Sequence, residues 1–106
     1  MAQFDVHRNL GRHKAAIPFV VIVQSSQFDD YRRRIVVPLV RASVLERSEL
    51  PHFNPTFKIR GTAVVFHPLE IVSVPAEKLG SRVGSLSAEG ERIIAALDEL
   101  FSRAWK

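Results

Sequence analysis

The sequence predicts a mainly β domain with a single C-terminal helix, an α+β fold in which a small antiparallel sheet or partly closed barrel carries the helix on one face. Two observations lead to this prediction. Six short apolar segments follow one another between tight turns, and the last twenty residues form one amphipathic stretch. A chain of 106 residues is long enough for one core and too short for two, so we expect a single domain over residues 1–106.

The C-terminal stretch, residues 87–106, has the 3.6-residue period of an amphipathic helix. Ser87 is a favourable N-cap, and Gly90 is expected to weaken the first turn by about 1 kcal/mol relative to Ala. An apolar arc of about 140° exceeds the roughly 100° needed to lie on one core, so we expect its far flank, which carries Trp105, to serve something other than the fold. The residues of this arc are Ile93, Ile94, Leu97, Leu100, Phe101, Ala104 and Trp105.

The rest of the chain is rich in strand patterns. Residues 3–8 alternate, with Asp5 and His7 on the face opposite Val6, which predicts a half-buried strand. Arg60-Gly61 separates two strand patterns and predicts a hairpin. Residues 42–50 predict a short helical turn, and residues 80–84 are expected to lead into the helix. The six predicted strands are residues 3–8, 17–23, 34–40, 56–60, 62–66 and 69–74.

Two of the predicted strands, residues 17–23 and 34–40, are apolar on both faces. Pro38 interrupts the second strand, so we expect it at a bulge or at a solvent-facing edge. One helix covers only one face of such a sheet. The other apolar face needs barrel closure or a second copy of the chain, and we therefore predict a homodimer.

The net charge of +4 is unevenly distributed along the chain. Residues 1–60 carry ten Lys or Arg against five Asp or Glu, whereas residues 87–106 carry three against four. A helix with net negative charge repels phosphate, so no direct nucleic-acid readout is expected from it. The basic N-terminal half attracts an acidic partner, and charge alone leaves RNA, DNA and acidic peptides open.

The composition predicts a cytoplasmic protein. The chain has no cysteine, no apolar run approaching the roughly 20 residues of a membrane span, and no signal-peptide pattern at its start. We therefore expect neither disulfides nor a membrane segment.

No catalytic residue, metal site or cofactor is predicted. The chain contains no nucleophile elbow, P-loop or dinucleotide fingerprint. Its carboxylate pairs have spacings that are common on any surface, so no acid/base dyad is indicated. Arg32-Arg33-Arg34 beside Asp29-Asp30 is interpreted as a turn with solvated charges rather than a phosphate site. Metal-ligand spacing is lacking among the four histidines, His7, His13, His52 and His67.

Several short motifs, in order along nearly the whole chain, are those of one family. They are QFDV at residues 3–6, FVVIVQS at 19–25, RRRIVVPL at 32–39, SVP at 73–75 followed by Gly80, and Leu86-Ser87 at the start of the helix. The chain resembles the CcdB-type toxins, the killer half of toxin–antitoxin modules of plasmids and chromosomes. The resemblance implies an SH3-like, five-stranded antiparallel sheet with a long C-terminal helix, a two-fold dimer, and a protein-binding poison rather than an enzyme.

The resemblance also implies partners and a contact surface. The partners are an acidic, partly disordered antitoxin that neutralises the toxin, and the A subunit of DNA gyrase. In the family, Trp-Gly-Ile directly follows a Phe at the gyrase-contacting end. Here the Trp comes three residues later, which is about 4.5 Å along the helix axis and roughly 60° around it, so it cannot enter a partner's pocket in the same pose. The candidate gyrase-contacting residues are Phe101, Ser102, Arg103, Ala104, Trp105, Phe28, Gln27 and Phe4.

Two other functions stay open at this point. Toxins of the MazF and Kid type are similar in fold and cut RNA, and the corresponding candidate residues here are His7, His13, Arg12 and Arg33. The altered C-terminus also fits a non-toxic relative that keeps only the dimer and the antitoxin-binding groove.

Overall fold

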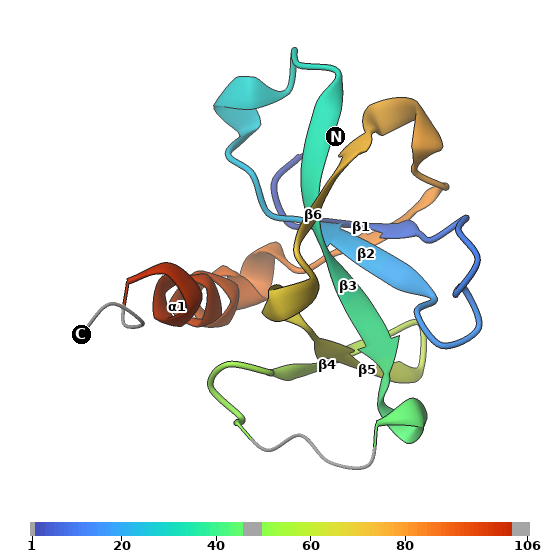
Figure 1. Cartoon of the computed structure of the whole chain (residues 1–106), viewed down its shortest axis with the longest axis vertical. Coiled ribbons are helices and arrows are strands. Elements are labelled where there is room, and N and C mark those ends of the chain that lie inside the picture. The colour runs from blue at the N-terminus through green and yellow to red at the C-terminus, as the bar shows by residue number, and fades with distance from the viewer. Residues whose placement is uncertain (1, 46–49, 103–106) are drawn as a thin grey trace.

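The computed structural model describes residues 2–45 and 50–102 of the chain (Figure 1). Within these residues, seven antiparallel strands curl into a half-barrel and one C-terminal helix packs against it. The predicted fold class is confirmed, with one strand more than the six expected. The elements are β1 (Asp5–Arg8), β2 (Phe19–Ile22), β3 (Arg33–Arg41), β4 (Thr56–Ile59), β5 (Thr62–Phe66), β6 (Val72–Pro75), β7 (Arg82–Ser85) and α1 (Gly90–Phe101).

β3 is the strand around which the sheet is organised. It runs antiparallel to β2 along one edge. Its other edge is shared, because residues 33–36 pair with β6 and residues 39–41 pair with β5. The strand order is β4-β5-β3-β2-β1-β7, with β6 as a branch from β3. The sheet therefore divides at the middle of β3, and Figure 1 shows β6 at one end of this strand and β4 and β5 at the other.

Pro38 lies at this division, and the expectation of a bulge or a solvent-facing edge is wrong. Pro38 is buried opposite Val20, in a β2–β3 register that runs without a shift. Its carbonyl accepts a hydrogen bond from the backbone N–H of His67 at 3.2 Å. The nitrogen of Pro38 faces the edge of β3 that β6 and β5 share. It lies between Val36, the last residue paired with β6, and Leu39, the first residue paired with β5. The missing N–H is tolerated there because β3 changes partner at this point.

The local turns agree with the sequence in part. The predicted hairpin is confirmed: Arg60 and Gly61 both have positive φ, of 49° and 82°, as a tight primed turn between β4 and β5 requires. Residues 42–44 form a 3-10 turn, and residues 46–49 of the predicted helical turn lie outside the described residues. The strand predicted over residues 69–74 begins only at Val72, because a 3-10 turn, η3 (Pro68–Glu70), precedes it.

β1 departs from the half-buried strand that alternation predicts. It begins at Asp5 because Phe4 has a left-handed φ of 69°. Asp5 and His7 are buried together with Val6, so the strand is covered on both faces. β7, which the sequence assigned only as a lead into the helix, pairs with β1 in the sheet, and this segment supplies polar contacts to the buried side chains. Arg82 forms an ion pair with Asp5 at 3.2 Å, and the carbonyl of Gly80 accepts a hydrogen bond from Nδ1 of His7 at 2.9 Å.

The start of the helix also differs from the prediction. Residues 87–89 form a 3-10 turn and α1 follows, while residues 103–106 lie outside the described residues. The N-cap prediction for Ser87 is wrong: Glu89 precedes α1, and no side chain makes a capping hydrogen bond there. Gly90 is favoured by packing, since a Cβ at this position would lie 2.8 Å from Cε2 of Phe4 unless the ring shifted.

Buried side chains form two clusters, one on each face of the sheet. The larger lies between the sheet and α1, which contributes Ile93 and Ala96. The smaller consists of Val20, Ile22 and Val36, with the partly buried Val74 and Leu79 packed on it. The larger cluster contains Val6, Phe19, Val21, Val23, Val37, Leu39, Phe57, Ile59, Val64, Phe66, Leu86, Ile93 and Ala96.

Candidate protein-binding surfaces

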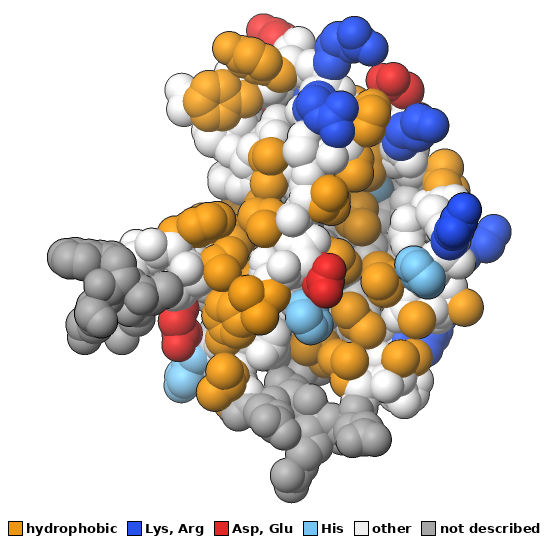
Figure 2. Space-filling view, in the orientation of Figure 1, with side chains coloured by type: hydrophobic (Ala, Val, Ile, Leu, Met, Phe, Trp, Pro, Cys, Tyr) orange, Lys and Arg blue, Asp and Glu red, His pale blue; other side chains and the backbone are white. Residues whose placement is uncertain are grey.

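The outer side of α1 carries exposed apolar side chains. Ile93 and Ala96 face the core, whereas Ile94 is 48% exposed and Phe101, at the end of α1, is 66% exposed. η3 packs against α1 and exposes 67% of Leu69. We call Leu69, Ile94 and Phe101 the helix patch. Figure 2 shows hydrophobic side chains where α1 meets the rest of the molecule.

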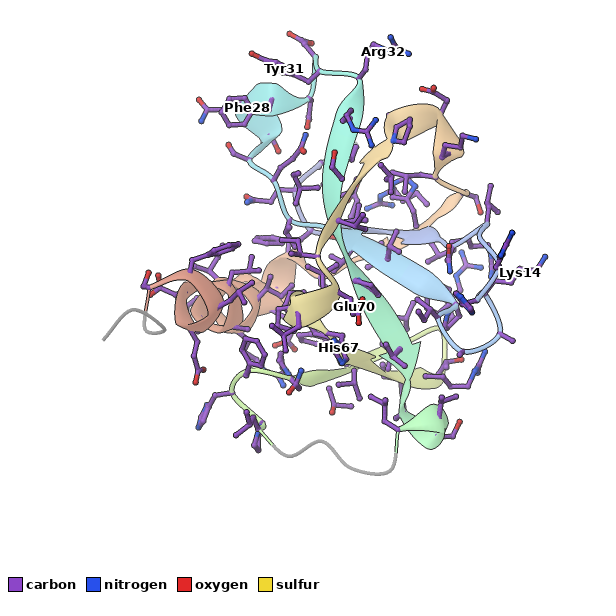
Figure 3. All side chains as sticks on the ribbon, viewed as in Figure 1. Lys14, Phe28, Tyr31, Arg32, His67 and Glu70 are labelled. Atoms are coloured by element: carbon purple, nitrogen blue, oxygen red, sulfur yellow. The ribbon has the colours of Figure 1, made fainter. Side chains whose placement is uncertain are left out.

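A second apolar surface lies at the turn between β2 and β3. Phe28 ends the 3-10 turn η1 (Ser26–Phe28), and its ring meets that of Tyr31 edge to face with centroids 5.8 Å apart. The two rings are 44% and 66% exposed. Figure 3 shows both side chains at the top of the molecule, beside Arg32 and on the same side as α1. We call Phe28 and Tyr31 the aromatic tip.

The aromatic tip is held in shape from beneath by Arg34. The Arg34 side chain is buried and donates hydrogen bonds to the backbone carbonyls of Asp29, Tyr31 and Arg33. Gln24 connects the start of the loop to β3, because its Oε1 accepts a hydrogen bond from the N–H of Ile35 at 2.8 Å. The loop is therefore fixed by a side chain of β3 and by one that lies shortly after β2.

The N-terminal segment links the aromatic tip to the helix. Gln3 donates through Nε2 to the carbonyl of Val23 at 3.1 Å, and its N–H donates to Oγ of Ser26 at 3.2 Å. Phe4 donates its N–H to the carbonyl of Ile22 and packs its ring against Gly90. Phe4 thus sets the position of α1 against the sheet and is only partly exposed.

The other candidate gyrase-contacting residues have different surroundings. Gln27 and Phe28 are both exposed, next to each other in η1. Phe101 and Ser102 are exposed at the end of α1, where Oγ of Ser102 donates to Oδ1 of Asp98 at 3.0 Å. The remaining three candidates, Arg103, Ala104 and Trp105, lie outside the described residues. Nothing in the sequence pattern distinguished Tyr31, which the structure places in the aromatic tip.

The four residues considered for RNA cleavage are not gathered in one place. Arg12 and His13 lie in the loop between β1 and β2 and line a surface hollow of about 450 Å³. His7 and Arg33 are not among the residues that line it. His7 is buried beneath the Gly80 segment, and the guanidinium of Arg33 is bound by Ser73, with Nε 2.7 Å from Oγ and Nη2 2.8 Å from the carbonyl oxygen.

A metal site is not formed by the part of the chain that the structure describes, where no group of three or more His, Asp or Glu side chains is arranged to hold an ion.

Among residues 2–45 and 50–102, no helix is both long enough and apolar enough to span a membrane.

Apolar side chains exposed on a helix and on a braced loop are typical of a domain that acts by binding another protein. The comparison with protein families specifies this class further. The model of the family described as CcdB protein matches residues 3–102, and the chain belongs to this family. It is therefore a toxin of the toxin–antitoxin class, as the motifs in its sequence predict. No curated protein matches the chain.

Proposed function

We propose that this protein is a homodimeric toxin that poisons DNA gyrase by binding its A subunit, and that an acidic, partly disordered antitoxin neutralises it. One observation carries the proposal: large apolar side chains are exposed on α1, η3 and η1, where they contribute little to the core. Membership of the CcdB family supports the same reading. On this proposal the protein acts in the cytoplasm, without catalysis and without a cofactor.

The helix patch supports the dimer. Leu69 and Ile94 lie on packed elements and are about half or more exposed in the single chain. A two-fold dimer uses the same patch of both subunits, so one apolar patch on each chain is sufficient for self-association. Burying these side chains against a second copy removes apolar surface from water, at roughly 25 cal/mol per Å².

The aromatic tip supports the contact with gyrase. Aromatic side chains are enriched among the residues that dominate binding free energy at protein interfaces. The tip is exposed, braced by Arg34 and located in the turn that carries the candidates Gln27 and Phe28. On this proposal Phe28 enters the partner's surface, and the end of α1 at Phe101 adds a second contact.

The overall charge supports an acidic antitoxin. The chain has a net charge of +4 and a pI near 10.1. A positive net charge increases the rate at which an acidic partner associates, and this attraction weakens as salt is added. We therefore expect the association of the antitoxin to slow with increasing ionic strength.

The test uses purified protein, gyrase and supercoiled DNA. The unaltered chain is expected to scatter light as a dimer at micromolar concentration and to trap gyrase-mediated cleavage complexes. Phe28→Ala should lower the yield of these complexes by about 30-fold, the effect of removing about 2 kcal/mol of interface free energy. Val44→Ala is the matched control, because Val44 is also exposed and apolar and lies on another turn.

Other outcomes of the same assay contradict the proposal. A monomer at this concentration would contradict the proposed homodimer. Equal yields of cleavage complexes from Phe28→Ala and Val44→Ala would contradict the proposed role of the aromatic tip in binding gyrase. RNA products that disappear with His13→Ala would indicate the ribonuclease function instead. Inducible expression that leaves cells unharmed, with no cleavage of DNA or RNA, would indicate the non-toxic relative. Trp105→Ala in the same assay tests the C-terminal contact.

A further inference from the structure

The face of the sheet opposite α1 contains a hollow of about 450 Å³ that the proposed function does not use. Its volume lies within the roughly 300–1,000 Å³ of small-molecule sites. Its inner surface is aliphatic and belongs to the smaller buried cluster and its surroundings. The aliphatic residues of the sheet and of the segment after it that line the hollow are Val20, Val36, Pro38, Val72, Val74 and Leu79, and Leu10 and Ile17 of the loop before β2 also line it. We call this site the valine hollow.

The rim of the valine hollow is positively charged. Arg12 and His13, from the loop before β2, and Lys78, from the turn after β6, line it, and no Asp or Glu is among its described lining residues. Arg8 also lines the hollow, but its guanidinium lies over the ring of Phe19 at 5.9 Å, within the other cluster. Figure 2 shows hydrophobic side chains over the middle of this view, with an acidic side chain among them, and Lys and Arg side chains along the upper right and right; Figure 3 labels the central acid as Glu70, which does not line the hollow.

The loop that carries Arg12 and His13 has a fixed conformation. Asn9 holds it across its base: its Nδ2 donates to the carbonyl of Ile17 at 2.8 Å, and its Oδ1 accepts from the N–H of Gly11 at 2.9 Å. The N–H of Ile17 donates to the carbonyl of His13 at 2.7 Å. The backbone that carries Arg12 and His13 is therefore preorganised, which lowers the entropic cost of binding a ligand.

The opposite wall of the hollow is fixed by Gly80. A Cβ at this position would lie 2.8 Å from the carbonyl oxygen of Arg8 and 3.1 Å from Cδ2 of Leu10, so the segment carrying Lys78 and Leu79 approaches β1 as closely as only Gly permits. The carbonyl of Gly80 is held by Nδ1 of the buried His7. Both walls are thus held by hydrogen bonds that involve buried or half-buried side chains.

We propose that the valine hollow binds a small amphiphilic anion, an aliphatic chain that ends in a carboxylate. The aliphatic surface takes the chain, and the Arg12 and Lys78 side chains take the carboxylate. Charge complementarity argues for an anion, because three basic side chains and no acid line the rim. The size of the hollow argues for a small ligand over an extended polypeptide. This proposal does not rest on gyrase as the target.

The test is a titration of the full-length protein with linear carboxylates from hexanoate to decanoate, below their micelle concentrations, followed by calorimetry and by NMR. Each additional methylene should tighten binding by about fourfold until the hollow is full. The neutral alcohol of the same length should bind at least about tenfold more weakly, because it lacks the charge-assisted hydrogen bonds. The proposal is supported by saturable binding that tightens with chain length and that is stronger for the carboxylate than for the alcohol.

Three variants decide whether the ligand occupies this hollow. Arg12→Ala with Lys78→Ala should weaken octanoate binding by about tenfold or more and leave the alcohol unaffected. Val74→Trp, which fills the hollow from β6, should weaken both ligands. Lys58→Ala is the matched control, because Lys58 is an exposed cation of β4 that does not line the hollow. Circular dichroism confirms that each variant is folded.

Three results would overturn the proposal. The first is the absence of saturable carboxylate binding to the folded protein. The second is binding that the paired Arg12 and Lys78 substitutions leave unchanged. The third is a short acidic peptide that binds through Arg12 and Lys78 while octanoate does not, which would assign the rim to a protein partner.

Discussion

The two faces of the sheet are covered in different ways. The face toward α1 has an apolar cluster with large, fully buried side chains such as Phe66 and Ile93. The opposite face has only three buried apolar residues in its cluster, and polar contacts complete its cover at Asp5 and His7. The first face therefore stabilises the fold through packing, whereas the second keeps a hollow and uses hydrogen bonds and an ion pair. The main core and the valine hollow therefore lie on different sides of one sheet.

The largest expected effect compares the packing on the two faces. Phe66→Ala should lower the free energy of unfolding by about 3–5 kcal/mol, because it opens a cavity in the larger cluster. Val74→Ala, on the opposite face, should cost about 1 kcal/mol or less, since Val74 is only partly buried. Urea unfolding measures both values. Similar losses for the two variants would contradict the division of roles between the faces.

An intermediate effect tests how tightly α1 is seated. Gly90→Ala in an exposed helix would stabilise by up to about 1 kcal/mol. Here the added Cβ meets the ring of Phe4 at 2.8 Å, so we expect a loss of about 1–2 kcal/mol. Thermal unfolding measures the change. The same substitution in a Phe4→Ala background should no longer destabilise, and a stabilising Gly90→Ala in the unaltered chain would show that the ring moves aside freely.

The smallest effect concerns the polar cover of the opposite face. Arg82→Ala removes the ion pair with Asp5, whose carboxylate is buried and also accepts a hydrogen bond from the N–H of Ala2 at 2.9 Å. Because the Arg82 side chain is largely exposed, we expect a loss of about 0.5–1 kcal/mol. The loss should shrink in 1 M salt, as measured by urea unfolding. Lys58→Ala, on the exposed side of β4, is the control and should change stability less.

Much of the fold was predictable because its signals are local. The helix and the Arg60-Gly61 hairpin follow from periodicity and turn chemistry within a few residues. Pro38 and β7 were not predictable in the same way, since each depends on which strands meet across the sheet. The burial of Asp5 and His7 depends on contacts with Arg82 of β7 and with Gly80 just before it. The short sequence of this segment has only a weak strand pattern.

The candidate surfaces were predictable to a smaller extent. Phe28 and Phe101 follow from the resemblance to the toxin family, and their exposure is known only from the structure. Periodicity placed Ile94 and Phe101 in the same arc as the buried Ile93, because it does not measure how far the sheet reaches around a helix. Arg12 and His13 were considered in the sequence for RNA cleavage, and the aliphatic hollow that they line depends on the long-range packing of Leu79 on β2 and β3.

The buried Arg34 has a consequence for whatever binds at the aromatic tip. The backbone carbonyls of Asp29, Tyr31 and Arg33 converge on its guanidinium, so a side chain of β3 holds this loop in one conformation. On the proposed function, the target docks against a loop that is already ordered, so more of the contact energy is left for affinity. On that proposal, the fold of the toxin itself sets the geometry of the contact, before the target is encountered.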